Sequence, residues 1–278
     1  MATYGMVIDV SRCTGCYNCF LACRDEHAGN GHLPVAAAQP DSGHRWMDVQ
    51  EHERGKFPRV RVDYVPLPCQ HCAVATCISM SPDGSVYRRD DGIVIIDPEM
   101  AVGKREIVSS CPHRAIFWNE ALAIPQKCTL CAHLIDQGGK QPRCVEACPT
   151  QALVFGDLDD PDSEISNLRR SGAVENLHPE YGLQPLVGYI ALPKRFIVGE
   201  VAFADLPDAP ARGVELRLEG GARSLHMATD AFGDFAFEKL EADVDYTLHV
   251  AAKQYRPRQF HVGRKRDADL GTIVLQPG

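Results

Sequence analysis

The placement of the cysteines constrains this chain more than any other feature of its sequence. All twelve lie between Cys13 and Cys148, and residues 149–278 contain none. A secreted scaffold held by disulfides is normally much shorter and distributes its bridges through the whole fold. The first half of the chain must therefore fold so that many thiols come together for a purpose other than disulfide bonding.

The first and the last groups of cysteines follow one plan. The first group is Cys13, Cys16, Cys19 and Cys23, and the last is Cys128, Cys131, Cys144 and Cys148, followed by Pro149. The gaps of two, two and three residues in the first group are those of bacterial ferredoxins, where three close thiolates hold one 4Fe–4S cube and the fourth reaches a second cube. A tight loop can wrap three thiolates around three corners of a cube. By this crosswise rule we expect one cluster on Cys13, Cys16, Cys19 and Cys148, and a second on Cys128, Cys131, Cys144 and Cys23.

The middle of the chain supplies the four remaining thiols, which are Cys69, Cys72, Cys77 and Cys111. At the positions where a four-cluster arrangement would place further ligands stand Ser81, Ala101, Lys104 and Ile107. Under the crosswise rule these positions belong to one cluster, so a whole cluster is missing and the remaining thiols complete a third. The sequence thus predicts three 4Fe–4S clusters on twelve thiolates, with no thiol left over.

Zinc is the main alternative for these residues, because pairs of cysteines two residues apart also build tetrahedral zinc sites. The ferredoxin spacing, and the prolines that follow Cys111 and Cys148, favour iron–sulfur clusters instead. His71 and His133 stand beside cysteine pairs, and each could donate a hydrogen bond to cluster sulfur or simply pack. Lys104 could place its ammonium where a cluster is missing, or it could be solvated.

Three segments of the chain differ in pattern. Residues 1–155 hold the cysteines, while residues 156–195 are rich in Asp, Pro and Gly, which predicts a surface linker that could wrap a partner. From residue 196 to residue 278, short alternating strands broken by turn residues predict a small β-sandwich. Its turn from Thr229 and its strand at Tyr246 resemble the transthyretin-like or carboxypeptidase-regulatory-like domain, an immunoglobulin-like sandwich. The predicted fold class is α+β, a tandem bacterial-ferredoxin-like domain followed by an all-β sandwich.

Several motifs in the first 155 residues resemble the iron–sulfur subunits of the dimethyl-sulfoxide-reductase family of molybdenum enzymes. They are Pro68-Cys-Gln-His-Cys72, Gly92-Ile-Val94 and Lys127-Cys-Thr-Leu-Cys-Ala-His133. Most members of that family carry four clusters. The loss of one, a C-terminal β-sandwich and the segment Gly43-His-Arg-Trp-Met47 are similar to the subgroup of pyrogallol–phloroglucinol transhydroxylase and resorcinol hydroxylase small subunits.

The resemblance implies an electron-transfer subunit whose large catalytic partner carries molybdenum on a bis-molybdopterin guanine dinucleotide cofactor (bis-MGD) and acts on polyhydroxylated aromatics. It also implies that the cluster with Cys13 lies nearest the molybdenum and that the cluster with Cys69 is the distal one. We expect no catalytic residue in this chain, because it has no nucleophile elbow, zinc-protease motif or phosphate-binding loop. A free-standing polyferredoxin, and an iron–sulfur subunit of a molybdenum reductase with a non-aromatic substrate, are the alternatives.

The overall composition argues against several other classes of protein. The formal net charge of −8 argues against a nucleic-acid partner, because phosphate binding needs clustered positive charge. No apolar run approaches the roughly 20 residues that a membrane-spanning helix needs. The N-terminal residues show no export signal, so we expect a cytoplasmic protein unless a partner subunit carries the signal for both. Further assembly of the expected heterodimers is left open.

Overall fold

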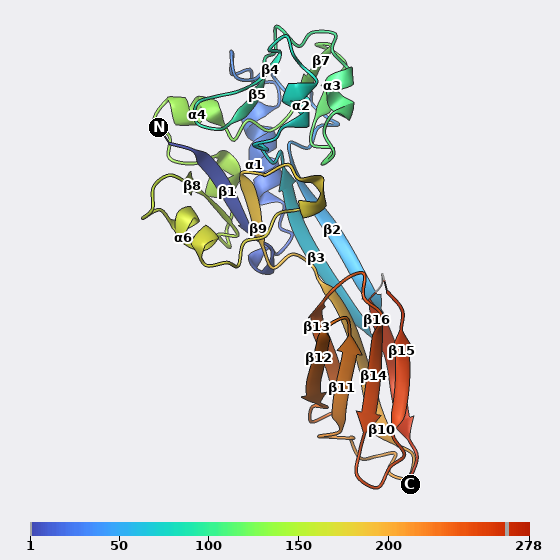
Figure 1. Ribbon diagram of the computed structural model, residues 1–278. Coiled ribbons are helices and arrows are strands. Elements are labelled where there is room, and N and C mark those ends of the chain that lie inside the picture. Colours follow the sequence, from blue (N-terminus) through green and yellow to red (C-terminus); the bar gives the residue numbers. More distant parts are fainter. Residues whose placement is uncertain (1, 265–266) are drawn as a thin grey trace. The chain divides into compact units, whose positions relative to one another are not determined.

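The computed structural model describes residues 2–264 and 267–278, which form two compact units (Figure 1). The first unit comprises the residues up to His52 together with Asp63–Leu192. The second comprises Glu53–Val62 and the described part of Pro193–Gly278. All twelve cysteines belong to the first unit.

The first unit is assembled from short strands and helices. Two of its strands, β2 and β3, lie only partly in this unit, because Glu53–Val62 belongs to the second. In chain order the elements are β1 (Tyr4–Asp9), the 3-10 helix η1 (Val10–Arg12), α1 (Asn18–His27), β2 (Met47–Lys56), β3 (Arg59–Pro68), α2 (Thr76–Ser79), β4 (Val86–Arg88), β5 (Val94–Ile96), α3 (Glu106–Ser109), β6 (Phe117–Asn119), β7 (Ile124–Gln126), α4 (Ala132–Asp136), α5 (Arg143–Glu146), β8 (Leu153–Asp157), α6 (Glu164–Arg170), the 3-10 helix η2 (Pro179–Tyr181) and β9 (Val187–Ile190). Strands β4 and β5, and strands β6 and β7, pair as antiparallel hairpins, and β2 pairs with β3. Within the described residues, no helix is both long and apolar enough to cross a bilayer.

A three-stranded sheet ordered β8-β1-β9 ties the two ends of the cysteine region together. Strand β1 is antiparallel to β8 and parallel to β9. Because β1 is central, Met6, Val7 and Ile8 are all buried, which is why its sequence is a continuous apolar run. A Cβ atom at Gly5 would lie 2.7 Å from the Leu186 carbonyl oxygen, so only glycine fits there. Strand β1 leads into the first cysteine group and β8 follows the last, so their pairing brings these groups close.

The structure differs from the predicted linker over residues 156–195. This segment contains α6, whose N-cap hydroxyl on Ser163 accepts a hydrogen bond from the Ser166 N–H at 3.2 Å, and β9, which pairs with β1. The chain belongs to the first unit as far as Leu192. Helix α6 has seven residues and β9 has four, and such short elements show no clear periodicity in a sequence. The wrapping of a partner by this segment stays a prediction.

The tip of the β2–β3 hairpin also differs from the predicted domain boundaries. The sequence places it in the first domain, whereas in the structure it belongs to the second unit. Arg54 pairs with Asp267 at 3.1 Å, and Arg59 pairs with Asp269 at 3.6 Å and with Asp234. These are ion pairs between residues far apart in the chain, and the spacing of the charges along the sequence gives no sign of them.

The second unit contains two sheets that share one apolar core. Its strands are β10 (Arg195–Phe203), β11 (Glu215–Gly220), β12 (Arg223–Ala228), β13 (Asp234–Leu240), β14 (Tyr246–Ala251), β15 (Arg258–Val262) and β16 (Ala268–Leu275). One sheet has the order β13-β10-β16 and the other β12-β11-β14-β15. Alternate side chains such as Ile197, Leu216, Phe235 and Leu248 fill the shared core, as the period of two in the sequence predicts.

The turn that the sequence predicts before β13 is closed by an aspartate. The Asp230 Oδ1 atom accepts hydrogen bonds from the N–H groups of Phe232 at 2.8 Å and Asp234 at 2.9 Å. Such a side-chain acceptor fixes a tight turn without help from the rest of the fold. The closer likeness of this unit to transthyretin-like domains stays a prediction.

Candidate metal centres

The structure brings the first and the last cysteines of the chain together. Burial raises the pKa of Cys13, and the charges of Cys148 and Cys16 raise it further, while a hydrogen bond from the Gly15 backbone lowers it. Burial also raises the pKa of Cys19 to about 12, with contributions from Cys13, Cys148 and Cys16. We call these four thiols the first group.

A second group forms around the last cysteine motif. Burial raises the pKa of Cys144 well above its usual range, and the charges of Cys131, Cys128 and Cys23 add to that rise. Cys23 lies on α1, so this helix carries one thiol of the first group, Cys19, and one of the second. The helix therefore connects the two groups, and the crosswise sharing of ligands between two clusters stays a prediction.

The third group lines one cavity in the middle of the unit. Cys69, Cys72, Cys77 and Cys111 all face this cavity. Burial raises the pKa of Cys72 to about 12, and the charges of Cys69, Cys111 and Cys77 raise it further. The twelve thiols thus form three groups in the structure, and the assignment of each group to one cluster stays a prediction.

The loops between neighbouring cysteines have a strained backbone. Left-handed φ angles occur at Tyr17 (61°), His71 (46°), Leu130 (49°) and Cys131 (50°), none of which is glycine. Each such residue costs about 1–3 kcal/mol and persists only where the surrounding structure demands it. Left-handed residues in a tight loop can direct backbone N–H groups toward one point, as happens around iron–sulfur clusters and other anions.

Backbone N–H groups point at several of the sulfur atoms. The Leu130 N–H donates to the Cys128 sulfur at 3.4 Å, and the Ala152 N–H donates to the Cys148 sulfur at 3.3 Å. Burial would raise the pKa of Cys148, but hydrogen bonds from Thr150 and Ala152 outweigh it and lower that pKa. Donors of this kind stabilise sulfur that carries negative charge.

The protonation state of the buried thiols bears on whether the three thiol groups can hold a cluster. Burial raises the pKa of Cys19 and of Cys72 to about 12 and that of Cys128 to about 11, so these thiols keep their protons at neutral pH without a cation. A bound metal reverses this, since it deprotonates a coordinating thiol outright. Sets of four thiols with inward-pointing N–H donors fit a 4Fe–4S cube, in which four thiolates complete the iron coordination.

The three groups form a series with the second in the middle. The charge of Cys19 helps to raise the pKa of Cys144. Burial is the main cause of the raised pKa of Cys128, and the charge of Cys69 is the next cause. All four thiols of the second group are buried, whereas each outer group has one buried thiol and three that are at least partly exposed. The buried member of each outer group is the one that faces the second group, Cys19 on one side and Cys69 on the other. The outer groups therefore reach solvent at opposite ends of the series.

The positions of the missing fourth cluster are filled by other interactions. Ala101 and Ile107 are fully buried in a small apolar core with Val86. The Lys104 ammonium pairs with Asp83 instead of being free in solvent. Of the three partly exposed thiols in the third group, each packs against this apolar core. Apolar packing therefore closes the side of the third group where a further cluster would stand.

His133, which the sequence offers as a donor to sulfur or as a packing residue, contacts a carboxylate. Its Nε2 atom lies 2.9 Å from the Glu26 Oε1 atom. The ligand atoms of Glu26, His32 and His133 lie within 4.8 Å of one another. However, the Arg143 guanidinium already pairs with Glu26 at 3.2 Å, which disfavours a cation at this place.

Two residues near the thiols were not singled out as sulfur contacts by the sequence analysis. The Nε2 atom of His27 lies 3.9 Å from the sulfur of Cys131. Burial, followed by the charges of His133 and His32, lowers the pKa of His27 to about 3, so its ring is neutral. The other residue is Lys127, a buried lysine that lines the cavity of the third group. Its position next to Cys128, as the first residue of the Lys127–His133 motif, is the sequence signal that could have pointed to it.

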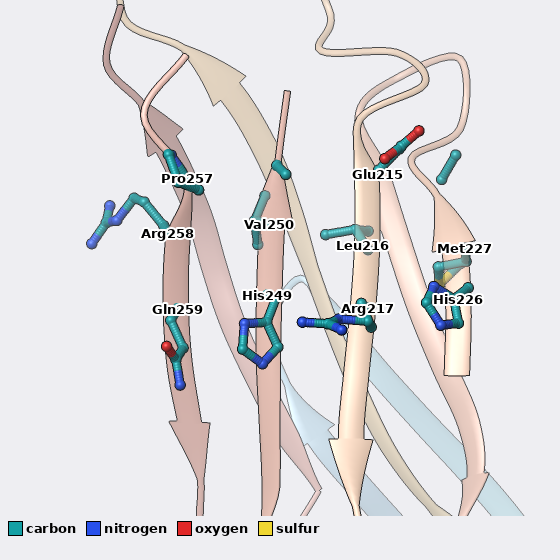
Figure 2. Close-up of a pocket in the computed structure, with 12 residues that line it drawn as sticks. Glu215, Leu216, Arg217, His226, Met227, His249, Val250, Pro257, Arg258 and Gln259 are labelled. Atoms are coloured by element: carbon teal, nitrogen blue, oxygen red, sulfur yellow. The ribbon is translucent and has the colours of Figure 1, made fainter. Parts of the chain in front are cut away.

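The second unit offers a groove of a different kind. Side chains of His226, Arg217, His249 and Gln259 lie in a row across β12, β11, β14 and β15 (Figure 2). Glu219 contacts Arg217 at 3.1 Å and His249 at 3.2 Å, so a carboxylate balances the charges in the row. We interpret the groove as the solvated outer face of the sheet.

Known proteins are similar to this chain in its sequence. The profile of the 4Fe–4S dicluster domain family matches residues 60–158. The pyrogallol hydroxytransferase small subunit of Pelobacter acidigallici is 38% identical over 99% of this chain and 100% of its own length. A sulfite dehydrogenase subunit of Allochromatium vinosum is 33% identical over 70% of this chain and 85% of its own. The arsenate respiratory reductase iron–sulfur subunit of Shewanella sp. is 30% identical over 67% of this chain and 95% of its own.

Proposed function

The chain belongs to the iron–sulfur electron-transfer subunits of the dimethyl-sulfoxide-reductase family of molybdenum enzymes, and we propose that it conducts electrons through three 4Fe–4S clusters. Its relatives are small subunits of larger enzymes, which implies a large catalytic partner. The observation that carries the proposal is the series of thiol groups, in which a buried middle group separates two partly exposed ones. A conductor needs this arrangement, because electrons must enter at one end and leave at the other.

The residues of this chain have three tasks in the proposed function. When bound, each 4Fe–4S cluster accepts and returns one electron without an open coordination site. The cysteine groups hold the clusters, each at the positions that the crosswise rule assigns. The backbone N–H groups at Leu130 and Ala152 stabilise the negative charge on sulfur. The apolar core around Ala101 and Ile107 keeps water from one side of the third group.

We propose that the first group faces the large subunit and that the third group is the distal end. Among the twelve cysteines, Cys16 alone is exposed, and it belongs to the first group. The analogy with the family puts this group nearest the molybdenum, which bis-MGD holds in the large subunit. The partner's proposed substrates are polyhydroxylated aromatics. The support for them is the pyrogallol hydroxytransferase small subunit, because its similarity extends over both units of this chain.

Metal analysis of the protein purified without oxygen from its native source tests this proposal. We expect about twelve irons and twelve sulfides per chain, with molybdenum in a large chain that co-purifies. The same iron content without molybdenum or a partner would indicate a free-standing polyferredoxin. About three zinc ions without sulfide would refute the electron-transfer function.

Substrate assays of the purified complex test the specificity. We expect turnover of pyrogallol or resorcinol and none of sulfite, arsenate or dimethyl sulfoxide. The opposite result would identify a molybdenum oxidoreductase with a non-aromatic substrate. We further propose that the complex is cytoplasmic, and cell fractionation with antibodies against this chain would test that location.

A further inference from the structure

His71 has one nitrogen fixed by the fold and one without a partner. The ring is completely buried, and the Val94 N–H of strand β5 donates a hydrogen bond to its Nδ1 atom at 3.0 Å. Since Nδ1 accepts, the proton of the neutral ring is on Nε2.

The Nε2–H group of His71 is therefore a buried donor that lacks an acceptor. Within the described residues Nε2 has no hydrogen-bond partner. Leaving such a donor unsatisfied costs about 1–3 kcal/mol, so native folds rarely do so. His71 lines the same cavity as Cys69, Cys72, Cys77 and Cys111. With Nδ1 turned to β5, Nε2 is the polar atom that is left to face this cavity.

Lys127 brings a buried positive charge to the same cavity. Its side chain is 2% exposed, and its ammonium donates to the Cys128 carbonyl at 3.1 Å and to the Val94 carbonyl. In the part of the chain that the structure describes, no carboxylate pairs with it. An ammonium at such a site is costly unless a negative charge lies nearby. The thiols of the third group can supply that charge, because they line the same cavity as Lys127.

We propose that His71 and Lys127 raise the reduction potential of the cluster held by the third group, His71 through an N–H···S hydrogen bond and Lys127 through its charge. This inference rests on the proposed function, since it requires the cluster to be bound. Reduction adds one electron, which comes from the neighbouring cluster of the second group, and no proton needs to move. The added negative charge lies beside a donor and an ammonium, so the reduced form gains more from both residues than the oxidised form.

His71 and Lys127 act on different numbers of clusters, so their substitutions should change the midpoint potentials differently. Lys127 contacts the carbonyl of Cys128, a ligand of the second group, and lines the cavity of the third. Its charge therefore acts on both clusters. His71 lines only the cavity of the third group and acts on that cluster alone. The electron is consequently favoured at the distal end of the series.

Redox titration followed by EPR, on the full chain with its clusters and any bound partner, tests the inference. We expect His71→Leu to lower the midpoint potential of one cluster, and Lys127→Met to lower the potentials of two. His71→Gln, which keeps an amide donor near the Nε2 position, and Lys127→Arg, which keeps the charge, should restore most of each loss. Lys104→Met is the matched control, because Lys104 pairs with Asp83 and does not line the cavity. Unchanged potentials in His71→Leu and Lys127→Met at full iron content would overturn the inference and leave the proposed function intact.

A second measurement needs no substitution and so avoids variants that fail to fold. In wild-type chain labelled with ¹⁵N-histidine, pulsed EPR of the reduced distal cluster should detect a coupled imidazole nitrogen, together with a proton that exchanges in deuterium oxide. Because His113 lines the same cavity, loss of this coupling in His71→Leu assigns it to His71. Absence of both couplings would refute the hydrogen bond from His71. A preparation without iron and sulfide would instead refute the proposed function itself.

Discussion

The crosswise pairing of cysteines makes a quantitative prediction for double substitutions. Cys13 and Cys148 lie in one thiol group although they stand at opposite ends of the cysteine region, whereas Cys23 lies in another group although it follows Cys13 closely. Each single Cys→Ser substitution should remove one cluster, which lowers the iron content from about twelve to about eight per chain. The double variants then separate the pairing rules, because two losses within one group coincide and two losses in different groups add.

The expected iron contents follow from the three groups. Cys13→Ser with Cys148→Ser should keep about eight irons, as either single variant does, whereas Cys13→Ser with Cys23→Ser should keep about four. If each cluster were instead held by neighbouring cysteines only, the two results would be exchanged. The assay is iron and sulfide analysis of protein purified without oxygen, with circular dichroism to show that the second unit is folded.

EPR of the single variants repeats the comparison without relying on stoichiometry. At low temperature, reduced Cys148→Ser and Cys13→Ser should lack the same signal, and Cys23→Ser should lack a different one. Matching spectra for Cys23→Ser and Cys13→Ser would refute the crosswise scheme. The thiols of one group would then lie close together without binding the same cluster.

Three further substitutions test the packing within each of the two units. Tyr189→Phe removes a buried hydroxyl that donates to the Pro66 carbonyl at 3.1 Å, so the first unit should lose about 1–3 kcal/mol, measured as faster loss of cluster absorbance in urea; an unchanged rate would contradict the assigned bond. Leu248→Ala opens a cavity in the second unit and should cost about 2–5 kcal/mol in its unfolding transition while the iron content stays constant; a loss of iron would show that the units are coupled. Gly5→Ala puts a Cβ atom 2.7 Å from the Leu186 carbonyl oxygen, and its melting temperature should fall, unlike that of Gly31→Ala, whose Cβ would lie at an ordinary contact distance of 3.7 Å from the Ala38 backbone nitrogen.

The cysteine chemistry could be predicted from sequence because ligand spacing is a local property. A loop that wraps a cube needs thiols two and three residues apart, and the chain from Cys13 to Cys23 shows this directly. The alternation around Leu216 and Leu248 predicted the β-sandwich for the same reason, since the period of two is set within each strand. Features of this kind depend on neighbours in the chain.

The other features of the fold and of the site depend on contacts between residues far apart in the chain, so they could not be predicted from the sequence. Strand β9 is only four residues long, and its pairing with β1 depends on Gly5 and other residues far away in sequence. The tip of the β2–β3 hairpin joins the second unit through ion pairs of Arg54 and Arg59. Among the histidines, the sequence ranked His71 and His133 alike. Only the structure separates them, because the Nε2 of His71 has no partner while that of His133 contacts Glu26.

The proposed series of three clusters ends at the third group, and the position of this end affects which reaction the partner can sustain. Ala101 and Ile107 fill the positions of a further cluster, so the proposed path has no fourth redox centre in this chain. Three one-electron clusters store about three electrons. A two-electron hydroxylation without an external acceptor should therefore stop within about two turnovers once the clusters are reduced.

A hydroxyl transfer between two polyphenols involves no net change in electron number, so it should continue under the same conditions. The measurement is product formation by the purified complex without an acceptor, while cluster absorbance is followed in the same cuvette. Sustained turnover with constant absorbance indicates a transhydroxylase, in which a distal cluster of raised potential holds electrons away from the active subunit. Turnover that stops as the absorbance bleaches indicates a hydroxylase that delivers its electrons through the third group to an external acceptor. Turnover that continues while the clusters bleach would contradict both, because the electrons would then leave by a route that avoids this chain.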